Sequence, residues 1–288
     1  MINSLYKFSP NRTEFFDNFL IRASNKHALN DPFEVHPSAE ALIDLFVNIG
    51  NGTFGSDRDE IGKFISEHEP NKQWELLGQP FFSDTGIISL TETKDNLLMW
   101  SHYANQHNGY VIEFNALHPF FTTHYASSNR SLIGETSRVL YRKERLCDLS
   151  NGNLMEVYFH KSDEWAYEKE SRLLVPFDSA DIILVDKKSA SRISCIKDYF
   201  SESNLKEFNN NFFSIENAPY PKNLHELSEL MFMFKVPKES IKSITFGART
   251  EASFVQTARE KLGKNQVNIP LYQATIDPYD YRLRFQPI

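Results

Sequence analysis

Short apolar runs of strand type alternate irregularly with segments of helical spacing along this chain of 288 residues. We predict strands at residues 5–8, 86–90, 109–114, 138–142, 173–175, 243–247 and 267–274, and helices at residues 13–22, 38–47, 57–68, 95–103 and 251–262. A doubly wound parallel sheet requires a regular β-α-β rhythm, which these elements lack. The pattern therefore predicts an α+β fold in which helices flank one mixed central β-sheet.

The middle of the chain differs from the rest because its patterns are helical. Residues 189–213 and 222–233 show helical spacing, and we find no strong strand pattern between residues 177 and 235. We therefore expect a helical insert at approximately residues 178–235. Because no convincing linker interrupts the sequence, residues 1–288 are predicted to form a single domain.

Charge and hydropathy limit the partners of this chain. The net charge of −7 argues against a general affinity for the nucleic-acid backbone, although it is compatible with a local basic groove. No run approaches the roughly 18 apolar residues that a membrane span requires, so we expect no membrane partner. Residues 1–10 lack the basic and apolar regions of a signal peptide, which leads us to expect a cytoplasmic protein.

Two carboxylates and an arginine stand directly before a short apolar run that ends at Pro176. Glu168 and Glu170 are two residues apart, so in an extended segment their side chains point to the same side. Two acids on one side repel each other unless a cation or a cationic substrate compensates them. Arg172 has the same parity and is a candidate for that cation. The cluster is either a catalytic carboxylate site or a surface group of ion pairs.

A second group of side chains, at residues 100–107, is rich in aromatic and polar aromatic residues. In a helix, Trp100 and Tyr103 lie three residues apart and share a face. One interpretation is that both rings pack in the core while His102 and His107 are solvated. The other is that the rings form an aromatic wall for a flat ligand such as a nucleobase or nicotinamide.

Common metal-binding and nucleotide-binding motifs are missing from the sequence. It contains no HExxH motif and no paired CxxC motifs, so we predict no metal site. It also contains neither a Walker A loop nor the G-x-G-x-x-G fingerprint of dinucleotide-binding folds. If the protein binds a nucleotide, it does so without the usual phosphate-binding loops.

Several short motifs occur in an order that resembles a large bacterial family of domains of unknown function. They are LYKF at residues 5–8, NDPFE at residues 30–34, MWSHYA at residues 99–104, HNG at residues 107–109, WAYEKESR at residues 165–172 and ITFG at residues 244–247. The resemblance spans nearly the whole chain. It implies little biochemistry, because the family is largely uncharacterised.

A more distant resemblance connects three of these segments to mono- and poly-ADP-ribosyltransferases. Residues 86–90 and the helix that ends at Tyr103 resemble the segment that frames the nicotinamide of NAD. Residues 168–176 resemble the E-x-E element that precedes a core strand in arginine-modifying transferases, and residues 5–8 stand at the position of strand one. In that strand, Tyr-Lys-Phe-Ser replaces the arginine or histidine that such enzymes usually present.

The resemblance implies an ADP-ribosyltransferase-like core and NAD as the substrate. Glu170 would stabilise an oxocarbenium-like ribose, and Glu168 would orient or deprotonate the acceptor. The residues implied to bind NAD are Tyr6, Lys7, Ser89, Trp100, Tyr103 and Arg172. The product would be an ADP-ribosylated protein or nucleic acid, and the biological role that of a toxin or antiphage effector.

Two other hypotheses remain open at this point. The chain could be a non-catalytic module that binds a nucleotide or a protein through the aromatic surface around Trp100 and Tyr103. It could also be a nuclease or hydrolase that holds a metal with Asp31, Glu34, Glu168 and Glu170, if distant segments converge.

Overall fold

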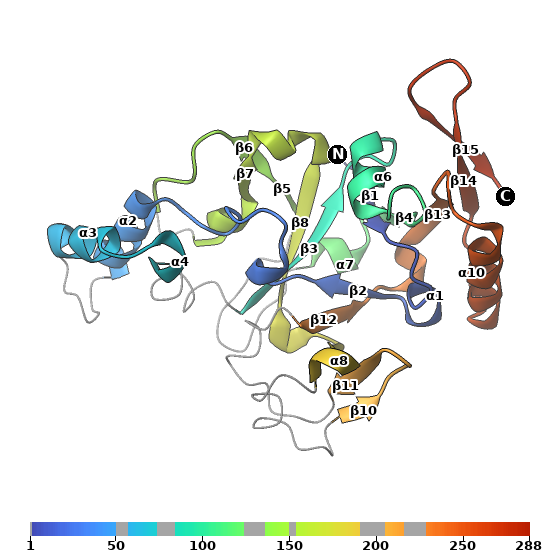
Figure 1. Cartoon of the computed structure of the whole chain (residues 1–288), viewed down its shortest axis with the longest axis horizontal. Helices are drawn as coiled ribbons and strands as arrows, with labels where there is room; N and C mark the ends of the chain where they lie inside the picture. Colours follow the sequence, from blue (N-terminus) through green and yellow to red (C-terminus); the bar gives the residue numbers. More distant parts are fainter. Residues whose placement is uncertain are drawn as a thin grey trace.

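A large mixed β-sheet organises the chain, whose computed structural model describes residues 2–49, 57–73, 84–123, 136–149, 154–190, 205–215 and 229–288. Its eight strands have the order β15-β14-β13-β4-β1-β3-β8-β5 (Figure 1). Their bounds are β1 Ser4–Ser9, β3 Thr85–Thr91, β4 Tyr110–Asn115, β5 Ser137–Arg138, β8 Glu170–Pro176, β13 Ile241–Phe246, β14 Leu271–Ile276 and β15 Leu283–Pro287. Among the described strands of this sheet, only β13 and β14 pair in parallel. The predicted α+β fold with a mixed sheet is confirmed.

A second, antiparallel sheet packs against the first and has the order β10-β11-β9-β12-β2. Its strands are β2 Leu20–Ala23, β9 Ile182–Asp186, β10 Leu205–Glu207, β11 Phe212–Ile215 and β12 Leu230–Lys235. The main hydrophobic core contains residues of both sheets, such as Ile88 and Leu173 from the large sheet and Ile21 and Phe232 from the second. The rings of Phe177 and Phe232 lie 4.2 Å apart, centroid to centroid, between the two layers.

The helical insert predicted at residues 178–235 is wrong for the described part of that range. Four strands occupy it, together with the short helix α8 (Lys187–Ala190) and the 3-10 helix η5 (Phe177–Ser179), while residues 191–204 and 216–228 lie outside the described residues. The strand β12 reads Leu-Met-Phe-Met-Phe-Lys, and its residues alternate between buried and half-buried. Because apolar side chains occupy both faces of this strand, its sequence lacks the alternation of apolar and polar residues that indicates a strand.

Most helices begin where the sequence predicts them. Their bounds are α1 Phe15–Asn18, α2 Ala39–Ile49, α3 Arg58–Ser66, α4 Pro70–Gln73, α6 Leu97–Tyr103, α7 Pro119–Thr122 and α10 Ala252–Lys264. Ser38 caps α2, since its Oγ accepts a hydrogen bond from the backbone N–H of Ala41 at 3.2 Å. The helix α6 is capped by Asn96, whose side chain accepts hydrogen bonds from the N–H groups of Leu98 and Met99.

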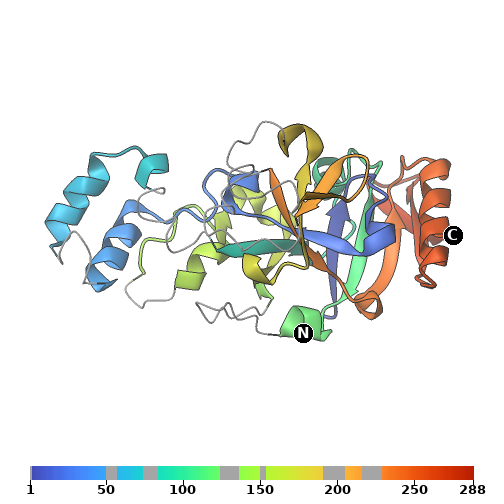
Figure 2. The same cartoon turned by 90° about the horizontal axis from the view of Figure 1, so that it is seen from below.

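The helix predicted at residues 13–22 is correct only in its first half. The helix α1 ends at Asn18, because Phe19, which follows it, is left-handed with a φ of 57°, and the chain continues into β2. At one end of the molecule lie α2, α3 and α4, and at the other lies α10 beside β14 (Figures 1 and 2). Among the described helices, none combines the length and the apolar character needed to cross a membrane.

A two-stranded parallel sheet, formed by β6 (Leu140–Arg142) and β7 (His160–Ser162), lies close to β8. The 3-10 helices η3 (Leu154–Phe159) and η4 (Asp163–Glu168) flank β7 in the sequence. A second hydrophobic core, which includes Ile87, Leu174 and Tyr158, connects this region to the large sheet and to α2. This arrangement brings the end of η4 and the start of β8 beside β3 of the large sheet.

Candidate functional site

A cavity of about 380 Å³ lies where β1 and β3 separate in the large sheet. The ladder between these strands consists of one pair, Tyr6 with Thr91. Beyond that pair the Nζ of Lys7 donates a hydrogen bond to the backbone carbonyl of Ser89 at 3.1 Å. A side chain thus replaces the next ladder bond.

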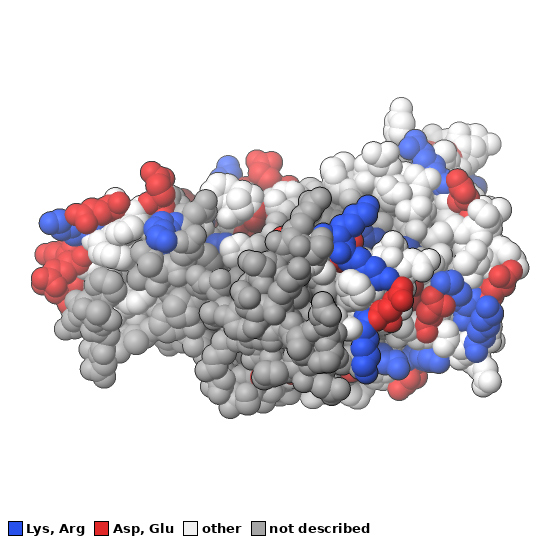
Figure 3. All heavy atoms as spheres, turned by 60° about the horizontal axis from the view of Figure 1, so that its bottom comes forward, with Lys and Arg blue, Asp and Glu red and all other residues white. Residues whose placement is uncertain are grey.

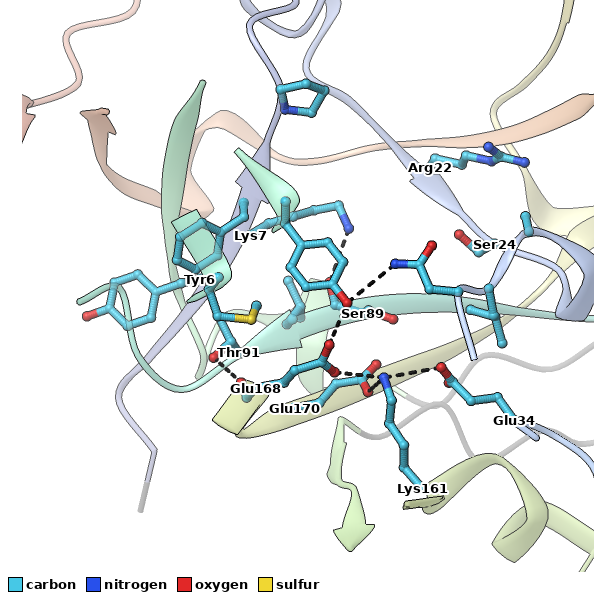
Figure 4. A pocket seen from close by; sticks show the side chains of 18 residues that line it. Tyr6, Lys7, Arg22, Ser24, Glu34, Ser89, Thr91, Lys161, Glu168 and Glu170 are labelled. Atoms are coloured by element: carbon cyan, nitrogen blue, oxygen red, sulfur yellow. Dashed lines mark hydrogen bonds and ion pairs between the residues drawn. The ribbon is translucent and has the colours of Figure 1, made fainter. Parts of the chain in front are cut away.

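Six of the eight predicted site residues line this cavity: Tyr6, Lys7, Ser89, Tyr103, Glu168 and Glu170. They come from β1, β3, α6, the end of η4 and the start of β8. In the sheet, β3 lies between β1 and β8, so three segments that are distant in the sequence become neighbours. Figure 4 shows the side chains of Glu168 and Glu170 beside one another near Ser89 and Lys161.

The two carboxylates share the cavity for a different reason from the predicted one. Glu168 ends a 3-10 helix, Lys169 is left-handed with a φ of 45°, and Glu170 begins β8, so they are not on one extended strand. The hydroxyl of Thr91 donates to the carbonyl of Glu168 at 2.6 Å. The backbone N–H of Glu170 donates to the Tyr141 hydroxyl at 2.7 Å. These bonds fix the backbone on both sides of the turn.

Arg172 lies beneath the cavity and does not line it. Its side chain is fully buried, and its Nε and Nη2 donate to the two carboxylate oxygens of Glu170 at 2.8 and 2.9 Å. It also donates to Glu34 and, at 2.6 Å, to the carbonyl of Tyr158. The predicted direct contact with a cofactor is therefore wrong, because the guanidinium is enclosed by protein. Arg172 is instead the predicted compensating cation, and it holds Glu170 in place.

Lys161 is a residue of the candidate site that the sequence did not reveal. Its Nζ lies 2.7 Å from Glu168, 3.1 Å from Glu34 and 3.3 Å from Glu170 (Figure 4). It also lies 4.8 Å from the centre of the Trp165 ring. It belongs to a three-residue strand without a motif of its own, so only the fold brings it to the carboxylates.

In this network three buried carboxylates, Glu34, Glu168 and Glu170, pair with two buried cations, Lys161 and Arg172. Burial would raise the pKa of Glu170, but Arg172 and Lys161 outweigh it and lower this pKa to about 2. Burial raises the pKa of Glu168 above its usual range despite the bonds from Lys161 and Tyr103. The environment thus separates the two acids, and Glu168 is the one that gains a proton more readily.

Tyr103 connects the wall of the cavity to Glu168. Its hydroxyl donates to a carboxylate oxygen of Glu168 at 2.5 Å and accepts from the Asn30 side chain at 3.4 Å. Burial and the neighbouring carboxylate raise the pKa of Tyr103, so the phenol remains protonated. The ring stands at the edge of the cavity, where a flat ligand could stack on it.

Trp100 belongs to the core, in agreement with the first of the two interpretations of residues 100–107. It has no exposed surface, and its Nε1 donates to the carbonyl of Lys94 at 2.7 Å. Its ring packs edge-on against Phe8 at 5.2 Å and does not line the cavity. The predicted contact between Trp100 and a cofactor is wrong, while Tyr103, one turn later, does reach the site.

The four carboxylates of the metal hypothesis do not form one cluster. Glu34, Glu168 and Glu170 converge, but the cations of Lys161 and Arg172 occupy the space between them. Asp31 lines a different cavity. In the described part of the chain, no group of three or more His, Cys, Asp or Glu side chains is suited to hold a metal ion.

The low pKa of Glu170 predicts an acid-sensitive fold. A carboxyl group whose pKa is lower in the folded than in the unfolded state stabilises the fold fully above its unfolded pKa, and this contribution disappears as pH falls towards the folded pKa. We therefore expect the free energy of unfolding to fall between about pH 4.5 and pH 2. Urea denaturation at several pH values measures it. In Glu170→Gln this part of the slope should flatten, and an unchanged slope would contradict the assignment.

Comparison with known proteins identifies one segment. Residues 99–173 match the family described as a protein of unknown function, DUF2971. This confirms, over that segment, the predicted resemblance to a family of domains of unknown function, and the segment carries Tyr103, Lys161, Glu168, Glu170 and Arg172. No curated protein and no solved structure matches the chain. The resemblance to ADP-ribosyltransferases therefore stays a prediction.

Proposed function

We propose that the protein is a cytoplasmic ADP-ribosyltransferase-like enzyme that transfers ADP-ribose from NAD to a macromolecular acceptor. The observation that carries the proposal is the convergence of Tyr6, Ser89, Tyr103 and Glu170 on one cavity. In this proposal β1, β3 and β8 form an ADP-ribosyltransferase-like core. The volume of about 380 Å³ lies in the range of small-molecule sites.

In the proposed reaction the bond between the ribose and the nicotinamide breaks, and nicotinamide leaves with the electron pair. Positive charge develops on the ribose, and the ionised carboxylate of Glu170 stabilises it. Because Arg172 and Lys161 hold this carboxylate in place, little reorganisation is needed during the reaction. Ser89 lines the same cavity as Glu170, so its hydroxyl can contact a ribose hydroxyl.

Glu168 is the proposed general base for the acceptor. Its raised pKa makes it a better base than an ordinary surface carboxylate. The acceptor hydroxyl or amine would lose its proton to Glu168 as it forms a bond to the ribose. Lys161 and the Tyr103 hydroxyl fix the orientation of the carboxylate. Tyr103 would stack on the nicotinamide.

Lys7 and Tyr6 are proposed to bind the rest of NAD from β1. Burial lowers the pKa of Lys7 to about 8, although Glu170 opposes the effect. Its ammonium is still largely charged at neutral pH and would gain from a pyrophosphate nearby. Lys7 thus takes the place of the arginine or histidine that is missing from this strand.

Two measurements with the wild-type protein test the proposal. NAD in large excess over its dissociation constant should raise the melting temperature, since a ligand that binds only the folded state stabilises it. Chromatography should then detect nicotinamide release during incubation with NAD and acceptor mixtures. A rise in melting temperature without nicotinamide release would favour a non-catalytic nucleotide-binding module. If neither a rise in melting temperature nor nicotinamide release is observed, the result contradicts any role for NAD.

A further inference from the structure

A second cavity, of about 250 Å³, adjoins the first and shares Lys161 with it. Its lining includes Arg142, Lys143 and Arg145 from β6 and the segment that follows, and all three are exposed. Within the described part of the chain, none of these three cations forms an ion pair with a carboxylate. Glu144 stands between Lys143 and Arg145 and lines the same cavity, as does Asp31, so these two carboxylates offset part of the charge. With Lys161 the lining cations outnumber the carboxylates, and the remaining positive potential favours an anion.

Two imidazoles beside these cations, buried His36 and half-buried His160, indicate the same potential. His36 lines the second cavity, and burial together with Lys26 and Arg145 lowers its pKa to about 4. Burial and the nearby Arg142 also lower the pKa of His160, whose Nδ1 lies 3.4 Å from Arg142 Nη1. Both imidazoles are therefore neutral at physiological pH and can donate or accept hydrogen bonds.

The cavity also offers an aromatic ring and a carboxylate oxygen. Phe33 is 60% exposed, and the guanidinium of Arg145 lies 5.9 Å from its ring centre. Asp31 is buried, and its Oδ1 accepts from the N–H of Phe33 at 2.9 Å. Its Oδ2 accepts no hydrogen bond from any described residue. Buried polar atoms are rarely left without a partner, so this oxygen suits a ligand hydroxyl or amino group.

The backbone between the two cavities is strained. Val35 has a φ of 53°, which is unusual for a β-branched residue. It separates Glu34, which lines the first cavity, from His36, which lines the second. Such a conformation costs about 1–3 kcal/mol in general. Residues in strained conformations occur more often at functional sites than in ordinary loops.

We propose that the second cavity binds a single-stranded nucleic acid, with Arg142, Lys143 and Arg145 on its phosphates and a base on Phe33. Cations that follow the backbone, combined with an aromatic ring that stacks on a base, are the usual way in which proteins hold single strands. The local site is compatible with the net charge of −7, which limits binding elsewhere on the surface. On the face shown in Figure 3, acidic and basic side chains are interspersed over the described part.

The position of this cavity suggests what the strand does there. Because Lys161 lines both cavities, a bound strand lies next to Glu168, the proposed base. The strand is thus the acceptor of ADP-ribose in our proposal. This role rests on the proposed function, whereas the binding of the strand does not.

The test measures binding without NAD. Fluorescence anisotropy with labelled 12-nucleotide single strands of RNA and DNA compares the wild type with the triple variant Arg142→Gln/Lys143→Gln/Arg145→Gln. We expect at least tenfold weaker binding by the triple variant. The slope of log affinity against log salt concentration should fall by about 2, because about three phosphate contacts are lost.

The matched control removes three exposed cations elsewhere, in Lys235→Gln/Arg259→Gln/Lys264→Gln. Arg259 and Lys264 lie on α10, away from β6 and β7 (Figure 1). The control has the same net charge as the triple variant and should bind within twofold of the wild type. Equal binding by the wild type and the triple variant, or no binding of either strand, overturns the proposal. The proposal is also overturned if the triple variant loses affinity for ADP-ribose but binds the strands as the wild type does. That result would assign the cavity to NAD.

Failure of this proposal is distinguishable from failure of the proposed function. Nicotinamide release into water without strand binding overturns the nucleic-acid proposal, including the acceptor assignment, and leaves the proposed cleavage of NAD in place. Strand binding that depends on the three cations, without nicotinamide release, supports the cavity and contradicts the transferase. An acidic protein captured in place of a strand would also overturn the nucleic-acid assignment.

Discussion

Glu170→Gln should lower the rate of nicotinamide release from NAD by a factor on the order of 10²–10³. Glutamine keeps the shape of the side chain but removes the negative charge that faces the developing positive charge on the ribose. Since this stabilisation is needed mainly in the transition state, kcat should fall much more than KM changes. Steady-state kinetics at a fixed pH measures both parameters. The fall in kcat is expected to result from loss of the negative charge and not from loss of the binding site.

The substitution also disturbs a buried ion network, so loss of activity must be separated from loss of stability. Glu34→Gln is the matched variant, because Glu34 bonds to the same two cations, Arg172 and Lys161. We expect both variants to be destabilised, whereas the activity of Glu34→Gln should fall by no more than about tenfold. Thermal unfolding in the presence of NAD shows whether each variant still binds it. Equal losses of activity in the two variants would reject the role of Glu170 and assign both effects to stability.

Local patterns were enough to predict the strands that build the candidate site. Residues 5–8, 86–90 and 173–175 have the apolar runs expected of strands, and they form parts of β1, β3 and β8. The side chains before or within these runs, such as Ser89 and Glu170, reach the cavity because the three strands are neighbours in one sheet. The order of the motifs along the chain does not show that these strands are neighbours. The expectation that their residues form one site came from the resemblance to ADP-ribosyltransferases.

Other parts of the site depend on contacts that no short pattern encodes. Lys161 acts through three carboxylates that are 7, 9 and 127 residues away in the sequence. The burial of Arg172 and Trp100 follows from packing against η3 and β1, not from their residue types, which are common at binding sites. The second sheet was missed for a related reason. Its strands β9 and β12 are apolar on both faces, and in such runs a helix and a buried strand look alike.

Arg172→Met should destabilise the fold by about 3–5 kcal/mol, because removing one partner of a buried ion pair leaves an uncompensated charge. The guanidinium bonds to Glu170, Glu34 and the carbonyl of Tyr158, and all of these acceptors are left in the protein interior. Methionine fills much of the space, so the loss measures charge and hydrogen bonds more than volume. Urea denaturation near neutral pH gives the difference in free energy of unfolding.

Two further variants decide how the loss is interpreted. Arg138→Met removes a guanidinium that pairs with Glu92 at the surface, where the Arg138 side chain is 65% exposed, and should cost less than about 1 kcal/mol. In the double variant Arg172→Met/Glu170→Gln the charge that was left alone is also removed. Its loss should be smaller than the sum of the two single losses by about 1–3 kcal/mol, as expected for residues in one network. Additive losses would mean that Arg172 and Glu170 stabilise the fold independently, and that Arg172 does not hold the proposed catalytic carboxylate.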